Sequence, residues 1–392
     1  MTDLAPQSEK ESDLIWMLRA LDLARQSVGV ASPNPAVGCV LVKNGAVIGE
    51  GFHAYDLRDH AEIVALKAAG PAAKGSTAYV TLEPCSHTGR TGPCADALIA
   101  AGIARVVVAI GDPNPSVNGQ GIASLRSAGI SVDVGLLKRE ARELNDDFAR
   151  YIQTGLPFVT LKAGLSLDGR IAPAPETRAT DAPVMLTGTG PVMLTSKESQ
   201  AEVQRMRQAS DALITGIGTV LADNPLLTDR SGLPRRRLLL RVVLDSKLRL
   251  PLDSRLVETA NEDLIVFCTT PNPERRRALE SLHIPVEQVT SEPGSNRVSL
   301  AQVLGRLGEM QLTSALLEGG SQLNSAALLH ADKLTLFYAP IFLGADAVPF
   351  LETSHPVPLR PVRTMLTKFG PDFRLEAWLR DPWSDSKSDI KS

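Results

Sequence analysis

Residues 81–94 read TLEPCSHTGRTGPC and place Cys85 and Cys94 nine residues apart around a polar loop. Upstream, His60-Ala61-Glu62 begins a segment, HAEIVALKAAG (60–70), whose apolar residues have helical spacing. The two cysteines could form a disulfide, a redox pair, a structural metal site or half of a catalytic metal site. The choice depends on the redox compartment and on which other ligands lie nearby.

The composition of the chain narrows these alternatives. Its 392 residues are 43% hydrophobic and 22% charged, with a net charge of −3, which is typical of a globular protein. A near-neutral charge gives no electrostatic basis for nucleic-acid binding. The polar N-terminus lacks a signal-peptide pattern, and no apolar run approaches the ~20 residues that span a bilayer. We therefore expect a cytoplasmic protein with reduced thiols, no membrane segment and no nucleic-acid partner.

Strand-like and helix-like segments alternate along the whole chain. AVGCVLVKNGAVIGEGFH (36–53) predicts two strands joined by an Asn44-Gly45 hairpin turn, and residues 137–155 have the pattern of one polar helix. Strand-length apolar runs between helices predict layered α/β folds with buried sheets. The chain is too long for one core, and we expect two α/β domains, at 1–150 and 156–380.

Three side chains in and before the opening stretch have the pattern of zinc ligands. His60, Cys85 and Cys94 supply one imidazole and two thiolates, which leaves a fourth position for water. Zinc lowers the pKa of a bound water toward about 7, and Glu62 is near enough in sequence to move its proton. A closed structural zinc site would need a fourth protein ligand, and two further histidines lie close enough in sequence to supply one.

The His-x-Glu and Pro-Cys pieces match the signature of zinc nucleobase deaminases, except that eight residues separate the cysteines here. With PNPAVGCVLVKNG (33–45), this longer loop resembles the pyrimidine deaminases of riboflavin biosynthesis. The loop offers His87 and Arg90 as receptors for a ribose phosphate. The resemblance implies that these two residues contact the substrate together with Asn34 and His53.

The second half of the chain resembles the reductase domain that this family carries at its C-terminus. The resemblance rests on KAGLSLDGRIA (162–172), GIGTVLADNPLLTDR (216–230), VLDS (243–246) and LLEGGSQLNSAALL (316–329). It implies a cytidine-deaminase-like three-layer domain followed by a dihydrofolate-reductase-like α/β domain. One departure is the segment 174–196, which is longer than is usual in the family.

The resemblance also implies two sets of contacts in the reductase domain. Glycines at a strand-to-helix turn such as 318–321 expose backbone N–H groups to a diphosphate. The expected substrate contacts are Lys162, Asp168, Arg207, Leu227, Arg230 and Glu318. The expected NADPH contacts are Leu165, Met193, Thr219, Asp223, Ser246, Gly320, Ser321, Gln322, Leu323 and Asn324.

Both motif sets together imply a bifunctional enzyme with one zinc ion per chain. Its first domain would hydrolyse the ring amine of 2,5-diamino-6-ribosylamino-4(3H)-pyrimidinone 5′-phosphate, and its second would reduce the ribosyl group to ribityl with NADPH. We expect a homo-oligomer that acts on small pyrimidine ribotides. A nucleic-acid-editing deaminase would need aromatic stacking platforms, but aromatic residues make up only 4% of the chain. A non-catalytic zinc protein would have lost Glu62 or a ligand, and neither is lost.

Overall fold

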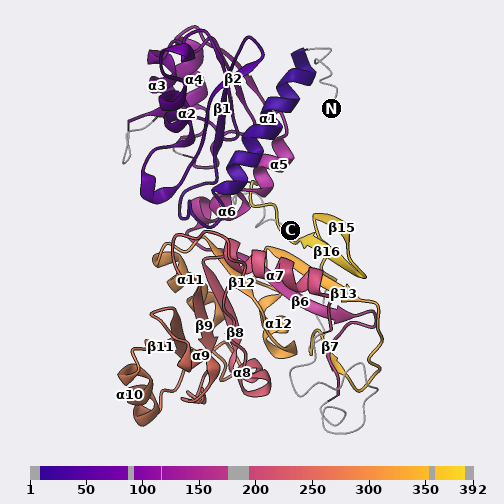
Figure 1. The fold of residues 1–392 in the computed structure, drawn as a ribbon. Coiled ribbons are helices and arrows are strands. Elements are labelled where there is room, and N and C mark those ends of the chain that lie inside the picture. The colour runs from indigo at the N-terminus through magenta and orange to yellow at the C-terminus, as the bar shows by residue number, and fades with distance from the viewer. Residues whose placement is uncertain (1–8, 87–91, 116, 175–193, 353–357, 385–392) are drawn as a thin grey trace. The chain divides into compact units, whose positions relative to one another are not determined.

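The computed structural model describes residues 9–86, 92–115, 117–174, 194–352 and 358–384 (Figure 1). They divide into two compact units. The first unit takes its residues from Met1–Gly155, Pro234–Arg237 and Pro382–Ser392, and the second from Leu156–Leu233 and Leu238–Asp381. Among the described residues, no helix combines the length and the apolar character that crossing a membrane requires.

The first unit is an α/β structure around a five-stranded sheet. Its strands are β1 (Gly38–Lys43), β2 (Ala46–Phe52), β3 (Thr77–Val80), β4 (Arg105–Val108) and β5 (Ser131–Val134). They follow the order β2-β1-β3-β4-β5, in which β1 is antiparallel to β2 and β3 while β3, β4 and β5 run parallel. Its helices are α1 (Glu9–Gln26), η1 (Tyr55–Leu57), α2 (Ala61–Ala69), η2 (Gly70–Ala73), α3 (Cys94–Ala100), α4 (Gln120–Ser127), α5 (Lys138–Glu143) and α6 (Asp146–Thr154).

Helices cover both faces of this sheet, because successive residues of a strand point to opposite sides. A Cβ at Gly38 would lie only 2.0 Å from the carbonyl oxygen of Ala20 in α1. The next residue, Cys39, pairs with Gly51, where a Cβ would lie 2.5 Å from Val64 in α2. The two glycines therefore let α1 and α2 pack closely on opposite faces, which makes three layers around one apolar core.

Two local predictions for the first unit had different outcomes. The hairpin turn is confirmed, because Asn44 and Gly45 have φ values of 53° and 74°, as a type I′ turn requires. The single helix expected over 137–155 is wrong, since α5 and α6 are separate helices. Asn145, which lies between them, accepts a hydrogen bond from the Ala36 N–H at 2.7 Å and donates one to the Ala36 carbonyl at 3.0 Å. This tertiary contact ends α5 and redirects the chain.

Two short segments from later in the sequence complete the first unit. Arg236 lies with its guanidinium 3.6 Å from the centroid of the Tyr55 ring. Trp383 donates its indole N–H to the Asp146 carboxylate at 2.8 Å and packs against the core of the first unit. Residues that follow the start of the second unit in sequence therefore form part of the first unit.

The second unit is built on a nine-stranded sheet. Its strands are β6 (Phe158–Ser166), β8 (Ala212–Gly216), β9 (Leu240–Leu244), β10 (Leu264–Cys268), β11 (Val286–Gln288), β12 (Ser314–Leu317), β13 (Lys333–Ala339), β15 (Arg363–Phe369) and β16 (Asp372–Trp378). They follow the order β11-β10-β9-β8-β12-β6-β13-β16-β15 and run parallel from β11 to β13, with β16 antiparallel to both neighbours. A separate two-stranded sheet joins β7 (Arg170–Ala172) and β14 (Val348–Pro349).

Helices connect the parallel strands of the second unit. They are α7 (Lys197–Ala209), α8 (Ile217–Asp223), α9 (Arg255–Glu258), α10 (Pro273–Ser281), α11 (Leu300–Glu309) and α12 (Ser321–Ala327). β8 passes directly into α8 at Ile217. β12 ends before Glu318 and α12 begins at Ser321, so the predicted strand-to-helix turn is confirmed.

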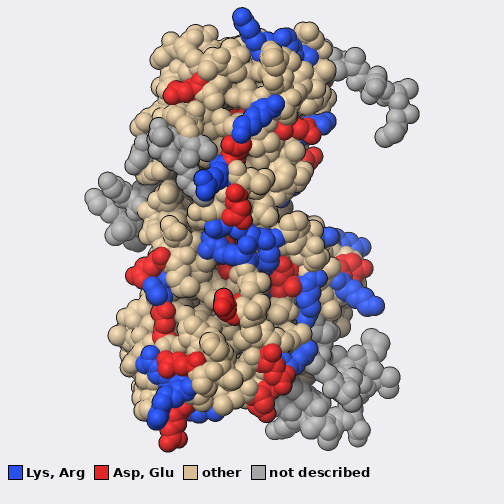
Figure 2. All heavy atoms as spheres, turned by 60° about the vertical axis from the view of Figure 1, so that its left-hand side comes forward, with Lys and Arg blue, Asp and Glu red and all other residues tan. Residues whose placement is uncertain are grey.

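Acidic and basic side chains lie interspersed on the face drawn in Figure 2. Exposed ion pairs include Arg19–Glu50 at 2.7 Å in the first unit and Arg306–Glu287 at 2.9 Å in the second. Such exposed pairs contribute only about 0–1 kcal/mol each. The stability of each unit therefore depends mainly on its buried apolar residues.

Candidate active sites

The three expected zinc ligands come together beside the carboxyl end of β3. His60 is the N-cap of α2, Cys85 lies in the loop after β3, and Cys94 is the first residue of α3. The His60 Nδ1 atom lies 3.6 Å from the Cys85 Sγ and 3.3 Å from the Cys94 Sγ, and the possible ligand atoms all lie within 4.8 Å of one another. Tetrahedral zinc, with Zn–N of about 2.0 Å and Zn–S of about 2.3 Å, suits such separations. The residues present therefore fit a zinc ion.

The pKa values of Cys85 and Glu62 suit metal binding and proton transfer, whereas the hydrogen bond with Cys85 and burial raise the pKa of the Cys94 thiol. A hydrogen bond from Cys94 lowers the pKa of the Cys85 thiol to about 4, and His60 adds to this effect. The thiolate is the form of cysteine that binds metals. Glu62 is only 3% exposed, and burial raises the pKa of its carboxyl to about 7. A group with that pKa can take up and release protons at neutral pH.

A cavity of about 320 Å³, which we call the metal cavity, is lined by His60 and Cys85 of this cluster. Asn34 and His53, two of the expected substrate contacts, line it together with Glu62. The His53 Nδ1 lies 2.9 Å from the carbonyl oxygen of Asp59, and its Nε2 lies 3.0 Å from the Asn34 amide nitrogen. Since a carbonyl only accepts, we assign the proton to Nδ1 and leave Nε2 to accept from Asn34. The other two expected contacts, His87 and Arg90, lie outside the described residues.

Glu83, to which the sequence analysis gave no role, holds the loop that carries Cys85. Its carboxylate is only 3% exposed and accepts hydrogen bonds at 2.9–3.2 Å from the backbone N–H groups of Asp112, Gly119, Gly121 and Ile122. These bonds join the loop that carries Cys85, which we call the metal loop, to the segment that follows β4. The one signal in the sequence was the position of this carboxylate, directly before Pro84-Cys85.

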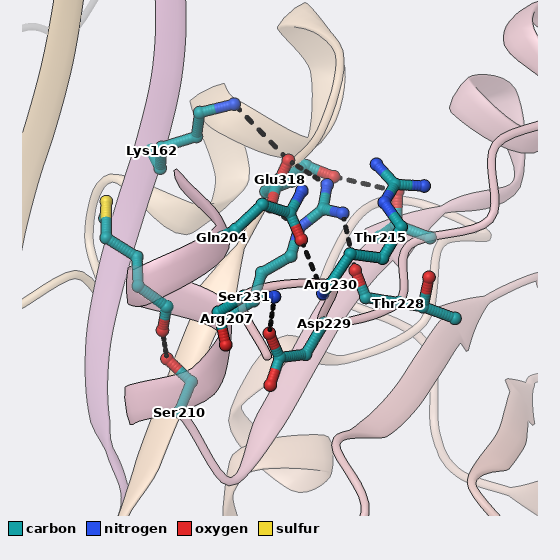
Figure 3. A network of polar contacts seen from close by, with 11 residues as sticks. Lys162, Gln204, Arg207, Ser210, Thr215, Thr228, Asp229, Arg230, Ser231 and Glu318 are labelled. Atoms are coloured by element: carbon teal, nitrogen blue, oxygen red, sulfur yellow. Dashed lines mark hydrogen bonds and ion pairs between the residues drawn. The ribbon is translucent and has the colours of Figure 1, made fainter. Parts of the chain in front are cut away.

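In the second unit, three expected substrate contacts form a partly buried ion-pair network (Figure 3). Leu161 of β6 pairs with Leu317 of β12, so the following residues, Lys162 and Glu318, lie side by side. Arg207 of α7 donates to both oxygens of the Glu318 carboxylate at 2.8 and 3.0 Å, and the Lys162 Nζ lies 3.3 Å away. A bidentate pair of this kind fixes the orientation of both groups.

The charge of Glu318 is set by its two cationic neighbours. Burial alone raises the pKa of the Glu318 carboxyl, but the charges and hydrogen bonds of Lys162 and Arg207 outweigh this and hold it at about 2. Arg207 also donates to the backbone carbonyl of Thr228 at 3.0 Å. The network is therefore charged at neutral pH and tied to the segment that follows α8.

The other expected substrate contacts are engaged elsewhere in the described part of the chain. Asp168 accepts hydrogen bonds from the backbone N–H groups of Leu343 and Gly344 in the loop after β13. Leu227 is buried in an apolar cluster. Arg230 lies near the ion-pair network, where its backbone N–H donates to the side chain of Gln204 in α7 at 2.8 Å.

A second cavity, of about 670 Å³, lies at the starts of α8 and α12, and we call it the cofactor cavity. The expected NADPH contacts that line it are Thr219, Ser246, Gly320, Ser321, Gln322 and Leu323. Two helix starts with glycines, at 216–218 and 319–320, expose backbone N–H groups that suit the phosphates of a dinucleotide. The donor set of this cavity therefore fits NADPH.

Four expected NADPH contacts are not among the described residues that line the cofactor cavity. Leu165 and Asn324 are buried, at 1% and 0% exposure. Asp223 is exposed at the end of α8, and Met193 lies outside the described residues. Sequence reasoning instead missed three cations that line the cavity, Lys247, Arg249 and Arg297.

The fold and these sites define the class of protein as a zinc-type deaminase joined to a reductase. Residues 10–110 match the family described as the cytidine and deoxycytidylate deaminase zinc-binding region, and residues 157–373 match the RibD C-terminal domain. The chain belongs to the RibD family of bifunctional deaminase/reductases of riboflavin biosynthesis. The family resemblance, the fold class and the bifunctional organisation expected from the sequence are thereby confirmed.

Similar proteins support this assignment over most of the chain. The riboflavin biosynthesis protein RibD of Actinobacillus pleuropneumoniae is 42% identical over 336 residues, which cover 85% of each chain. That of Escherichia coli (strain K12) is 41% identical over 349 residues, covering 86% of this chain and 89% of the relative. The solved structure of Acinetobacter baumannii RibD has a TM-score of 0.78 at 36% identity and covers 94% of this chain and 99% of that chain.

Replacing Gly121 with Ala should disturb the metal loop. A Cβ there would lie 1.9 Å from the carbonyl oxygen of Pro84, so the backbone next to Cys85 must move. We expect a loss of roughly 1–3 kcal/mol in the free energy of unfolding and less bound zinc. Calorimetry and elemental analysis measure both, with Gly305→Ala as a control, because a Cβ at Gly305 meets nothing within 4 Å. Full zinc content at wild-type stability would contradict this account of Glu83 and its loop.

Replacing Glu318 with Gln should destabilise the second unit at pH 7 by about 1–3 kcal/mol, because the buried guanidinium of Arg207 and the partly exposed ammonium of Lys162 lose their counter-charge. The folded pKa of about 2 lies below the ordinary value of 4.5. The carboxylate therefore stabilises the fold fully above that ordinary value, and its contribution is lost as the pH falls toward 2. Urea unfolding should show a wild-type advantage at pH 7 that shrinks at pH 3.

The matched control for Glu318→Gln is Glu287→Gln, which removes the same charge from an exposed pair with Arg306. That change should cost no more than about 1 kcal/mol. Equal effects of the two substitutions at pH 7 would show that the Glu318 network does not hold the second unit together.

Proposed function

We propose that the first unit deaminates 2,5-diamino-6-ribosylamino-4(3H)-pyrimidinone 5′-phosphate and that the second reduces the ribosyl group of the deaminated product to ribityl. The observation that carries this proposal is the cluster of His60, Cys85 and Cys94, of which His60 and Cys85 line one cavity with the buried Glu62. A solved relative from Thermotoga maritima supports it. That protein is described as a diaminohydroxyphosphoribosylaminopyrimidine deaminase/5-amino-6-(5-phosphoribosylamino)uracil reductase and has a TM-score of 0.76 at 34% identity, covering 95% of this chain and 99% of its own.

In the deaminase reaction, His60, Cys85 and Cys94 would hold zinc, which when bound supplies a water of lowered pKa, near about 7. Glu62 takes a proton from that water as it attacks the amine-bearing ring carbon. The same carboxyl would pass this proton to the ring nitrogen. It would then take the second proton of the former water, now the hydroxyl on the ring carbon, and deliver it to the departing ammonia. Its pKa of about 7 suits both directions of transfer.

The remaining residues of the metal cavity would bind and orient the ribotide. Asn34 and His53 hold each other in place beside the cluster, so they can fix the pyrimidine ring. His87 and Arg90 stay our proposed contacts for the ribose phosphate, from the loop between the two cysteines. Asn34 and His53 line the same cavity as Glu62, which supports their own proposed contact with the substrate.

In the reductase reaction, bound NADPH would supply the hydride. Lys162, Arg207 and Glu318 would position the sugar, with the carboxylate accepting from its hydroxyls and the cations facing its phosphate. Asp168, Leu227 and Arg230 complete the proposed substrate contacts. The proposed cofactor contacts are those of the cofactor cavity, extended by Leu165, Met193, Asp223 and Asn324.

We infer that the enzyme works in the cytoplasm on small-molecule ribotides. Its four cysteines, Cys39, Cys85, Cys94 and Cys268, are free thiols, as a reducing compartment maintains them. A homo-oligomeric state stays a prediction from the sequence.

Incubating the zinc-loaded protein with the diaminopyrimidine ribotide tests the deaminase. The wild type should release ammonia without NADPH and form the ribityl product only with it. Glu62→Gln should keep its zinc but release ammonia about 10²–10⁴-fold more slowly, because an amide cannot carry the proton. Glu50→Gln, in a surface pair with Arg19, is the control. Near-wild-type ammonia release from zinc-loaded Glu62→Gln would refute the assigned role.

Replacing Gly320 with Val should weaken NADPH binding by about tenfold or more, as expected when a charge-assisted hydrogen bond is lost. A Cβ at Gly320 meets nothing within 4 Å, so a branched side chain would occupy the space through which a diphosphate approaches the start of α12. Fluorescence titration with NADPH measures the affinity, and Gly305→Val is the control. Unchanged binding would place the cofactor elsewhere. Zinc content and ammonia release should not change.

A further inference from the structure

Arg58 combines an unusual backbone conformation with a place in the wall of the metal cavity. It lines that cavity together with His60 and Glu62. Its φ is 64°, in the left-handed region that residues other than glycine and asparagine rarely adopt. Strained backbone of this kind persists where the surroundings enforce it, and it is concentrated at ligand-binding positions.

Hydrogen bonds on each side hold Arg58 in this conformation. Its own N–H donates to the Tyr55 carbonyl at 3.2 Å, and the Asp59 N–H donates to the Leu57 carbonyl at 2.8 Å. The Asp59 carbonyl in turn accepts from the Nδ1 of His53 at 2.9 Å. The strained residue is therefore fixed between η1 and the metal ligand at the start of α2.

The carboxylates nearest to Arg58 in sequence are already paired with other cations. Asp56 accepts from the Arg236 guanidinium at 3.2 Å, and Asp59 accepts from the Lys67 ammonium at 2.5 Å. Among the residues that the structure describes, none gives the Arg58 side chain an acidic partner. Its positive charge is left available to a ligand.

The acidic groups of the cavity do not compete for this charge. Glu83 is engaged by backbone N–H groups, and Asp112 accepts from the Asn114 N–H at 2.8 Å. Arg58 is exposed, whereas Glu62 is 3% exposed. The cavity thus has a cationic, solvated side and a buried side that holds the metal ligands.

We propose that Arg58 binds the phosphate group of the deaminase substrate at the solvated side of the metal cavity, while the ring occupies the buried side. This inference rests on the proposed function and adds a contact to those expected from His87 and Arg90. A guanidinium matches a phosphate in a bidentate arrangement. A dianion at the solvated side also avoids most of the cost of burying its charge.

Arg58→Gly provides a test in which the backbone is not penalised, because glycine adopts a positive φ readily. The unfolding temperature and the zinc content should stay close to those of the wild type. The deaminase KM for the ribotide should rise roughly 10- to 100-fold, as loss of a charge-assisted hydrogen bond predicts. The inhibition constant of the phosphate-free riboside, measured in competition, should stay within about twofold. The KM of Arg58→Lys should lie between those of the wild type and Arg58→Gly, because lysine keeps the positive charge but lacks the two-pronged guanidinium.

Two controls separate charge from backbone effects. Asn44→Gly relieves another positive φ, of 53°, without removing a charge, and Arg139→Ala removes an exposed cation from α5. Both should keep the wild-type KM. An unchanged KM in Arg58→Gly overturns the proposal, and so does an equal rise in the KM and in the riboside's inhibition constant. If the wild type releases no ammonia from the ribotide, the proposed function fails and not this contact alone.

Discussion

In both units, residues of the candidate sites lie where neighbouring parallel strands end at the same edge of the sheet. In the first unit, β3 and β4 are parallel neighbours, so the loop with Cys85 and the chain after β4 emerge side by side and are joined through Glu83. In the second, the shared register of β6 and β12 brings Lys162 next to Glu318. Helices that begin at the same edges add backbone N–H groups, as is general for sites at strand ends of α/β folds.

The sequence predicted those features that depend on local chemistry. The candidate zinc ligands could be recognised because an imidazole and two thiols stood at the spacing of a metal site, with Glu62 two residues from His60. Alternation of apolar strands with helices was sufficient for two α/β units. The strand-to-helix turn at 319–320 was also predicted, because its two glycines follow an apolar strand.

The rest depends on partners that are far apart in sequence. Asn145 divides the predicted helix through bonds to Ala36, and no local pattern predicts that pairing. Glu83 gains its importance from N–H groups that lie 29 or more residues further along the chain. The availability of Arg58 depends on Asp56 being engaged by Arg236, which is 180 residues away in sequence.

Tyr55 and Asp146 have further consequences for how the two activities can be separated. Both belong to the first 155 residues, yet their partners Arg236 and Trp383 are encoded after the second unit has begun. A deaminase domain cut at the linear boundary would lose both partners and expose an aromatic ring and part of its apolar core. The two units are therefore not two independent segments joined end to end. Splitting it into two chains would require compensating substitutions at the surfaces that Arg236 and Trp383 now cover.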